Sequence, residues 1–433
     1  MGDQEMAIRT FSLGFGRGVL EVGLGLDRGH RGPRVDCGQG HPAEFVSYRE
    51  KSFDTVLGEV ELSRAYYHCE ACGRGVVPKD RELGVVGVTV SPGLARLVAR
   101  MGSQEPFEQS RQDLAELAEV QLTTKRIERF TESLGEQLQG REVAELKAIA
   151  GGEVVLLPAS QDTAAPGPGE TLYILMDGAS VPTVGKETEG RQGRGEDGRS
   201  RSREVKLGCL FTQSGLDAEG WAVRDEDTTS YIQSMAPAAE FGILLKGEAL
   251  RRGLARFQTS VVIGDGADWI WNIAGDHFAD SIEIVDYWHA RENLGRLAKL
   301  AFPIADSERA KWLARRLDEL ELGDMEALLE NFAKLLRRRA SRFIDEAALQ
   351  TAIGYFENNQ HRMYYGAYRE LGLFLGSGVV EAGCKNVAAL RLKRSGMRWT
   401  VRGASSVLTL RCCYMSRRWD AFWKSRHLQM QVA

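Results

Sequence analysis

Three acidic residues of this chain could together hold divalent metal ions. Asp177 and Asp265 each follow a short apolar run, and Glu381 lies far downstream in a basic, helical stretch. A carboxylate at the end of a buried strand loses hydration, which costs free energy, and a cation that shares the site offsets this cost. Three such carboxylates brought together could hold the two Mg²⁺ ions of a phosphoryl-transfer centre. Taken singly, each aspartate has a simpler interpretation, because Asp-Gly commonly forms a turn after a strand.

Length and composition indicate the domain number, the cellular compartment and the role of the cysteines. A chain of 433 residues is expected to form two to four domains with substantial cores. It shows neither a run long enough to span a membrane nor a signal-peptide stretch at the N-terminus, so we expect a cytoplasmic protein without a membrane partner. Seven cysteines in a chain of this kind argue against a disulfide framework.

The net charge of −4 hides a strongly basic segment near the C-terminus. Residues 385–426 contain eleven Lys or Arg residues and one acid, Asp420. Such a strip suits contact with phosphates, and with so few acids to balance it, a merely solvated helix face is the weaker interpretation.

The first segment, residues 1–82, has the pattern of a small zinc-binding domain. Residues 53–67 are rich in β-formers around Gly58, which predicts a hairpin, and Cys69-Glu-Ala-Cys72 follows directly. Cys37 and His41 could supply the other two ligands, although His68, His30 or Asp36 could compete for the fourth place. Four protein ligands would close the coordination shell, so this zinc would be structural. Unligated cysteines are the alternative.

Residues 83–150 are predicted to be helical. Ser91-Pro92 provides an N-cap and a first-turn proline, and Thr123-Thr124 could cap a later helix that carries Lys125, Arg126 and Arg129. This outline fits a helix-turn-helix that binds DNA, and it fits an ordinary helical hairpin equally well. Residues 151–170, rich in Pro and Gly, are predicted to be a linker.

Residues 171–292 have the strongest α/β pattern. The predicted strands are 172–176, 205–212, 220–224, 261–264 and 281–285, with residues 229–256 expected to be helical. Residues 293–373 look like an all-helical insertion, with Gly323-Asp324 as a cap pair between two helices. Residues 374–433 would complete the core with a helix that starts at Ser377 and carries Glu381.

The order of these parts resembles an RNase H-like DDE nuclease. Three local motifs go further: Leu175-Met-Asp-Gly-Ala-Ser-Val181, Val262-Ile-Gly-Asp-Gly-Ala267 and Asp286-Tyr-Trp-His-Ala-Arg-Glu-Asn-Leu294. Together with Gly376-Ser-Gly-Val-Val-Glu-Ala-Gly-Cys-Lys385 and Arg394-Ser-Gly-Met-Arg-Trp399, they resemble the ISKra-type family of bacterial insertion-sequence transposases. The resemblance covers nearly the whole chain. One departure is that family members usually begin the zinc knuckle with a cysteine pair, whereas Cys37 stands alone here.

The resemblance implies a fold, a metal centre and a set of site residues. The fold would be an α/β RNase H-like core, a mixed sheet with helices on both faces, interrupted by the helical insertion and preceded by the zinc knuckle and the helical DNA-binding region. Asp177, Asp265 and Glu381 would bind two Mg²⁺ ions. Asp286 and His289 match a D-x-x-H motif of related transposases, so His289 could orient the scissile phosphate or a ligand carboxylate, or simply close a strand end. The expected phosphate contacts are Arg391, Lys393, Arg394, Arg398 and Arg402.

The function that follows is transposition. The protein would bind the terminal inverted repeats of its own element, as a homo-oligomer on paired ends, and would cleave DNA and join it to target DNA in the bacterial nucleoid. Two alternatives stay open: an inactive, domesticated DNA-binding derivative, and a structure-specific nuclease that cuts without joining.

Overall fold

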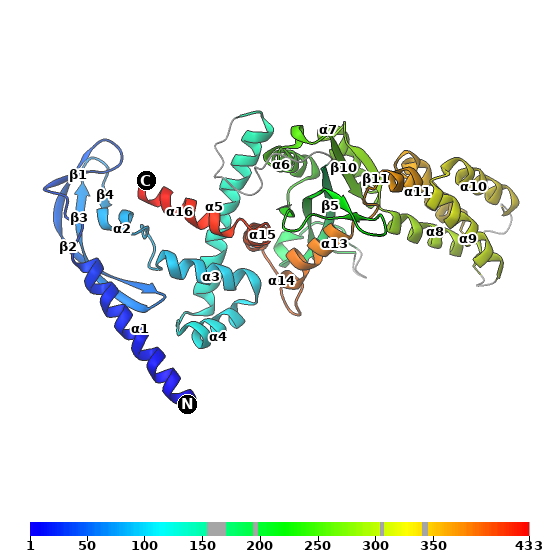
Figure 1. Ribbon diagram of the computed structural model, residues 1–433. Helices are drawn as coiled ribbons and strands as arrows, with labels where there is room; N and C mark the ends of the chain where they lie inside the picture. The colour runs from blue at the N-terminus through cyan, green and yellow to red at the C-terminus, as the bar shows by residue number, and fades with distance from the viewer. Residues whose placement is uncertain (154–169, 194–197, 304–306, 340–344, 433) are drawn as a thin grey trace. The chain divides into compact units, whose positions relative to one another are not determined.

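The chain divides into two compact units, residues 1–136 with 418–433 and residues 137–417. The computed structural model describes residues 1–153, 170–193, 198–303, 307–339 and 345–432 (Figure 1). Most of the predicted linker, residues 154–169, lies outside this range. None of the helices in the described ranges is long and apolar enough to cross a membrane.

The first unit is built on a four-stranded antiparallel sheet in the order β1-β2-β3-β4. Its strands are β1 (Arg34–Asp36), β2 (Pro42–Thr55), β3 (Gly58–Cys69) and β4 (Arg74–Val76). β2 and β3 form the predicted hairpin, with Gly58 at φ +110°, where a residue with a Cβ would be strained. A long helix, α1 (Gly2–Gly25), packs one side against β3. This helix was not among the elements predicted from the sequence.

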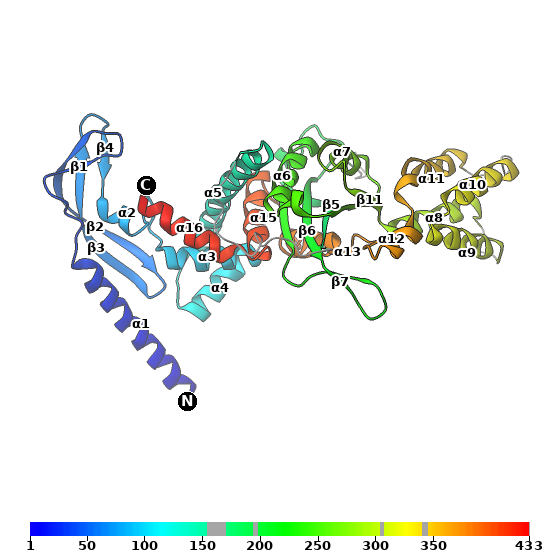
Figure 2. The same cartoon turned by 45° about the horizontal axis from the view of Figure 1, so that its top comes forward.

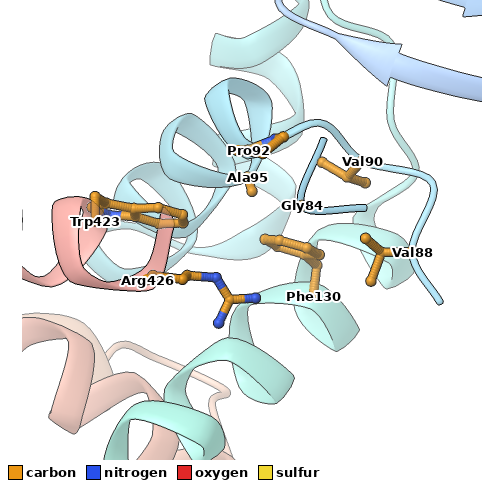
Figure 3. Close-up of a pocket in the computed structure, with 8 residues that line it drawn as sticks. All are labelled: Gly84, Val88, Val90, Pro92, Ala95, Phe130, Trp423 and Arg426. Carbon is orange, nitrogen blue, oxygen red and sulfur yellow. The ribbon is translucent and has the colours of Figure 1, made fainter. Parts of the chain in front are cut away.

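Helices complete the first unit. They are α2 (Pro78–Glu82), α3 (Pro92–Gln104), α4 (Phe107–Ala118), the first half of α5 (Thr124–Ala150), and α16 (Trp419–Val432). The predicted cap is present, since Ser91 Oγ accepts a hydrogen bond from Leu94 N at 3.2 Å. Trp423 and Arg426 of α16 meet Pro92 and Phe130 around a small, mostly apolar pocket (Figure 3). Residues 418–433 therefore cluster with the N-terminal residues, although the sequence analysis assigned them to the core that carries Glu381.

The second unit contains a mixed five-stranded sheet in the order β11-β10-β5-β6-β9. Its strands are β5 (Thr171–Pro182), β6 (Ser202–Gln213), β9 (Ser230–Ser234), β10 (Thr259–Gly264) and β11 (Ile282–Val285). β6 is antiparallel to both β5 and β9, whereas β10 is parallel to β5 and β11. The hairpin of β7 (Gly215–Leu216) and β8 (Ala222–Val223) forms a separate small sheet that extends from this one (Figure 2).

Helices cover both faces of this sheet. Neighbouring residues on a strand point to opposite faces. A Cβ built at Gly208 would meet Leu245 of α6 (Ala238–Arg251), and the side chain of the preceding residue, Leu207, lies against Gly383 of α13 (Gly378–Gly383). One face therefore carries α6 and α7 (Asp268–His277), and the other carries α13 and α15 (Val401–Met415). This confirms the predicted mixed sheet with helices on both faces.

The long helical segment follows β11 and lies beyond its edge of the sheet (Figure 1). It contains α8 (Tyr287–Ala301), α9 (Ser307–Leu322), α10 (Met325–Arg339), α11 (Glu346–Asn359) and α12 (Tyr365–Glu370). Tyr365 Oη donates to the carbonyl of Val285 at 2.9 Å and so fastens this segment to β11. The predicted cap pair is confirmed, because Gly323 has φ +76° and Asp324 Oδ1 accepts from Ala327 N at 3.0 Å.

Two local predictions were wrong. Residues 230–234 form the edge strand β9 and not the start of a helix, because all five are buried and pair with β6. Asp177 does not end its strand, since β5 continues to Pro182. Pairing with β6 extends β5 beyond its apolar run, and pairing with β6 also makes a strand of residues 230–234, whose sequence suggested a helix.

Candidate active site

Three aspartates stand at the same level of three adjacent parallel strands. Ile263 pairs with Leu175 and Gly264 with Val285. Continued by two residues from the first pair and by one from the second, this register brings Asp265 beside both Asp177 and Asp286, where β10 and β11 end. Parallel neighbours in register project to the same side of a sheet, so Asp177 and Asp265 face the side that α13 covers.

Asp177 is half-buried on the central strand β5. Burial raises the pKa of Asp177 above its ordinary value, and the negative charges of Asp265 and Glu381 raise it further, against hydrogen bonds from Cys384 and Gly178. The backbone N–H of Gly178 donates to Asp177 Oδ1 at 2.6 Å. Asp177 therefore lies within electrostatic range of both Asp265 and Glu381, and a divalent cation beside it would offset the cost of burying its charge.

Asp286 is the buried anchor of the site, with 1% of its side chain exposed. It caps α8, where its Oδ1 accepts from the backbone N–H of His289 at 2.7 Å, and its Oδ2 accepts from the backbone N–H of Ser377. Ser377 Oγ in turn donates to Glu381 Oε1 at 2.7 Å. Asp286 thus joins the start of α8 to the turn that begins the helix of Glu381.

His289 lies between two of these carboxylates. Its Nδ1 is 3.2 Å from Asp286 Oδ1 and 3.9 Å from Glu381 Oε1. Pairing with Asp286 raises the pKa of His289 to about 9, against the opposing effect of desolvation. Ligand atoms of Asp286, His289 and Glu381 all lie within 4.8 Å of one another, so these three could hold a metal ion. Among the described residues, no such close group includes Asp177 or Asp265.

The helix that carries Glu381 changes geometry directly after it. α13 ends at Gly383, and residues Cys384–Ala389 form a π-helix that leads into α14 (Leu390–Leu392). The buried Arg411 of α15 donates to the carbonyl of Val387 at 2.6 Å and to that of Asn386. A π-helical segment inside an α-helix is frequent at functional sites, and here a buried guanidinium binds two of its carbonyl oxygens.

A polar groove of about 990 Å³ begins at Asp265 and runs along β5 and β6. Gly178, Ser180 and Glu204 line it from the strands, and Arg199 and Arg201 line it from the segment before β6. Basic and acidic groups thus border the same opening, a composition suited to a phosphate-rich ligand that also needs cations.

The predicted phosphate contacts separate into two groups. Lys393, Arg394, Arg398 and Arg402 have exposed side chains between α14 and the start of α15. Arg391 is fully buried and lies over the ring of Trp399, with 4.9 Å from its guanidinium carbon to the ring centre. Trp399 is also buried, and its Nε1 donates to the carbonyl of Leu392 at 3.2 Å. Arg391 and Trp399 therefore support the fold of this loop.

The three basic residues of α5 are also unequal. Arg126 forms an ion pair with Asp54 of β2, and Lys125 pairs with Glu128 at 2.6 Å. Arg129 is exposed. Two of the three charges are thus neutralised within the first unit.

The predicted zinc ligands come together at one end of the first sheet. Cys37 and His41 lie in the turn between β1 and β2, Cys69 ends β3, and Cys72 lies in the next turn. Their ligand atoms are all within 4.8 Å of one another, with 3.7 Å between the sulfurs of Cys37 and Cys72 and 3.1 Å from that of Cys72 to His41 Nδ1. At Zn–S bonds of about 2.3 Å, a tetrahedral site places its sulfurs about 3.7–3.8 Å apart. The four residues therefore could hold a zinc ion, with His41 in the fourth position.

The thiol environment agrees with metal binding. Burial raises the pKa of Cys37, but backbone hydrogen bonds from His41 and Gln39 outweigh it and leave that pKa below its ordinary value. Burial and the neighbouring thiols raise the pKa of Cys72 to about 11. The first thiol loses its proton readily, and its negative charge then disfavours ionisation of the next thiol. A divalent cation bound between them would remove this repulsion.

Sequence reasoning missed two residues of the carboxylate site. Asp286 was noted only as part of a motif, and its place beside Asp265 becomes visible from the register of β10 and β11. Ser377 was taken only as the start of a helix. The spacing of Ser377 and Glu381, one helical turn apart, was the available signal for their contact.

Comparisons with known proteins add little to this geometry. No protein-family model matches the chain. No curated protein matches it either. Among solved structures, the chain is similar to the Drosophila P element transposase strand transfer complex, with 9% sequence identity and a TM-score of 0.35, over 78% of this chain and 95% of that one. A likeness this weak carries no functional conclusion.

Proposed function

We propose that this protein is a DDE transposase of the ISKra type, with an RNase H-like core, that cleaves and joins the ends of its own DNA element. The proposal rests on where the three carboxylates stand: Asp177 and Asp265 are neighbours in the register of β5 and β10, and Glu381 lies on α13, which packs against β5 and β6. A DDE centre needs this convergence, and a set of unrelated turn residues would not produce it.

The sheet supports the proposed fold. The strand that carries Asp177 is central, with an antiparallel neighbour on one side and the parallel strand that leads to Asp265 on the other. The helical segment interrupts the core between β11 and the helix of Glu381, which is the order that the resemblance implies.

The residues of the chain would divide the work of phosphoryl transfer. Asp177, Asp265 and Glu381 would hold two Mg²⁺ ions, which when bound activate the attacking oxygen and stabilise the leaving oxygen. Asp286 and Ser377 position Glu381 through the hydrogen bonds described above. His289, cationic at neutral pH in the metal-free site, would face a phosphate or a ligand carboxylate.

DNA would be bound by the exposed basic residues near this centre. Lys393, Arg394, Arg398 and Arg402 are the proposed phosphate contacts, and Arg391 is left out because its side chain is buried. In the first unit, Arg129 is the most available basic residue of the proposed helix-turn-helix. A structural Zn²⁺ at Cys37, His41, Cys69 and Cys72 would stabilise that unit.

A strand-transfer assay tests the proposal. Purified protein is mixed with labelled DNA that carries the terminal repeats flanking its coding region, target plasmid, and Mg²⁺. We expect cleaved ends and joined products from the wild type. Asp265→Asn and Glu381→Gln should each lose at least about 10³-fold in rate, because each removes an anionic oxygen from a metal centre, while binding to the ends persists.

The matched control is Asp268→Asn, which removes an exposed carboxylate one helical turn after Asp265 and should retain activity. Cutting without joining would support the nuclease alternative. Binding to the ends without any cutting by the wild type would support the domesticated derivative.

A further inference from the structure

One side of α1 packs against the rest of the first unit. Leu20 and Leu24 pack against the cluster around Phe53 and Val60 of the β2–β3 hairpin. Nearer the N-terminus, Arg9 forms an ion pair with Glu119 at 3.2 Å. These contacts fix a helix of 24 residues in which no residue is fully buried.

The opposite side of α1 carries a continuous apolar stripe in solvent. Its members are 57–85% exposed: Ile8, Phe11, Phe15, Val19, Val22 and Leu26. At about 100° per residue, all six fall within an arc of about 80°, turned roughly 160° from the side that Leu20 and Leu24 occupy. The N-terminal part of α1 projects beyond the sheet in both views (Figures 1 and 2).

This stripe is too large to be an ordinary monomer surface. At typical side-chain areas, the six residues expose on the order of 800 Å² of mostly apolar surface, which is about what each partner contributes to a stable interface. The helix also contains Gly14, Gly16, Gly18 and Gly23. Each costs about 1 kcal/mol of helix stability relative to alanine, so packing on both sides would offset a substantial penalty.

We propose that the stripe binds the α1 helix of a second copy of this chain in an antiparallel pair. Around a two-fold axis near Arg17, Phe15 lies opposite the partner's Val19, Phe11 opposite the partner's Val22, and Ile8 opposite the partner's Leu26. Each of the two phenyl rings thus meets a small β-branched side chain, and the three-and-four spacing of the stripe is that of helices packed side by side. The same surface serves both copies, as a two-fold interface requires.

Charge favours the antiparallel direction. The first turn of α1 carries Asp3 and Glu5, and Arg28 follows its C-terminal end. An antiparallel pair brings the acids of one copy towards Arg28 of the other, whereas a parallel pair would place like charges together. A membrane surface fits less well, because helices that lie on membranes carry Lys and Arg along their polar side and α1 begins with acids.

Sedimentation equilibrium of the full-length protein tests the interface. We expect a dimer for the wild type and a monomer for the Phe11→Asp, Phe15→Asp double variant, with the dissociation constant raised at least about 100-fold by the loss of two buried rings. Leu322→Asp is the matched control, since Leu322 is 74% exposed on α9, and it should leave the dimer intact. Unchanged circular dichroism and thermal unfolding of the double variant show that it still folds.

Cross-linking distinguishes the direction. Phe15→Cys and Val19→Cys proteins are mixed and oxidised, and the linked peptides are identified by mass spectrometry. We expect links between position 15 of one copy and position 19 of the other. Links from 15 to 15 would overturn the antiparallel arrangement. A wild type that stays monomeric, a double variant that stays dimeric, or wild-type monomers that bind anionic lipid vesicles through the stripe would each overturn the proposal.

Discussion

The two candidate metal sites of this chain are built in opposite ways. The N-terminal ligands all come from the turns and strand ends of one small antiparallel sheet, and they form a closed set of three sulfurs and one imidazole. The carboxylates come from β5, the end of β10 and α13, which are far apart in sequence, and one of them, Asp265, also lines a polar groove. A metal site closed by four protein ligands mainly stabilises the fold, whereas a carboxylate site with free coordination positions lets the metal bind a substrate.

The difference also predicts opposite signs for the free energy of unfolding. Removing a ligand from a closed zinc site removes folding free energy. Removing one of several neighbouring carboxylates removes a charge repulsion that lowers the free energy of unfolding of the metal-free protein. The three predictions below test this contrast, beginning with the largest effect.

Cys69→Ser should unfold or severely destabilise the first unit. Metal binding to such sets is worth on the order of 10 kcal/mol of folding free energy. We expect metal analysis to give about one zinc per wild-type chain and almost none in the variant, with a large loss in thermal stability. Cys413→Ala, which changes a buried thiol of the second unit, should keep its zinc. A zinc-free wild type with normal stability would contradict the closed site.

Asp177→Asn should raise the thermal stability of the metal-free protein. The raised pKa of Asp177 reports that its charged form is disfavoured by burial and by Asp265 and Glu381. We expect a gain of about 2–4 °C, the shift that roughly 1 kcal/mol produces in a domain of 150–250 residues. Scanning calorimetry in EDTA measures it.

The same variant should lose the stabilisation that Mg²⁺ gives to the wild type, which follows ligand concentration by mass action. Asp268→Asn should behave like the wild type in both measurements. An Asp177→Asn protein that is less stable in EDTA, or that still gains stability from Mg²⁺, would remove Asp177 from the metal site.

The smallest effect should come from the exposed basic residues. Arg394→Ala with Arg398→Ala should lower the slope of log affinity against log salt by about 0.9 for each lost phosphate contact. Sequence preference should change little, because phosphate contacts position DNA without reading bases. Binding titrations at several salt concentrations measure this. Lys299→Ala with Lys334→Ala, exposed on the helical segment, is the control pair. An equal slope for both double variants would place the DNA elsewhere.

Local order in the sequence explains why one site was easier to predict than the other. The cysteine pair after a hairpin singled out Cys69 and Cys72, and the turn before the hairpin offered Cys37 and His41, which the structure brings beside them. Asp177 and Asp265 were selected because apolar runs precede them. Their relation to Asp286 depends on strand register, which no spacing along the chain reveals.

Burial was the property that sequence patterns predicted least well. Arg391 and Arg398 are seven residues apart in the same basic strip, yet one is fully buried on Trp399 and the other is exposed. Residues 230–234 looked helical because β9 is an edge strand whose burial comes from α15 and β6. The stripe of α1 was overlooked, although its spacing is visible in the sequence, because interspersed glycines weaken the helical signal.

The π-helix after Glu381 has a consequence for the length of this segment. Each hydrogen-bonded turn of a π-helix encloses one residue more than a turn of the α-helices α13 and α14 on either side. Deletion of a single residue within Cys384–Ala389 would therefore let the whole helix become regular without breaking its backbone hydrogen bonds. That shorter helix would rotate Glu381 by about 100° relative to α14 and would move the two carbonyls away from Arg411. In this segment the number of residues, as much as their identity, determines where the carboxylate of Glu381 points.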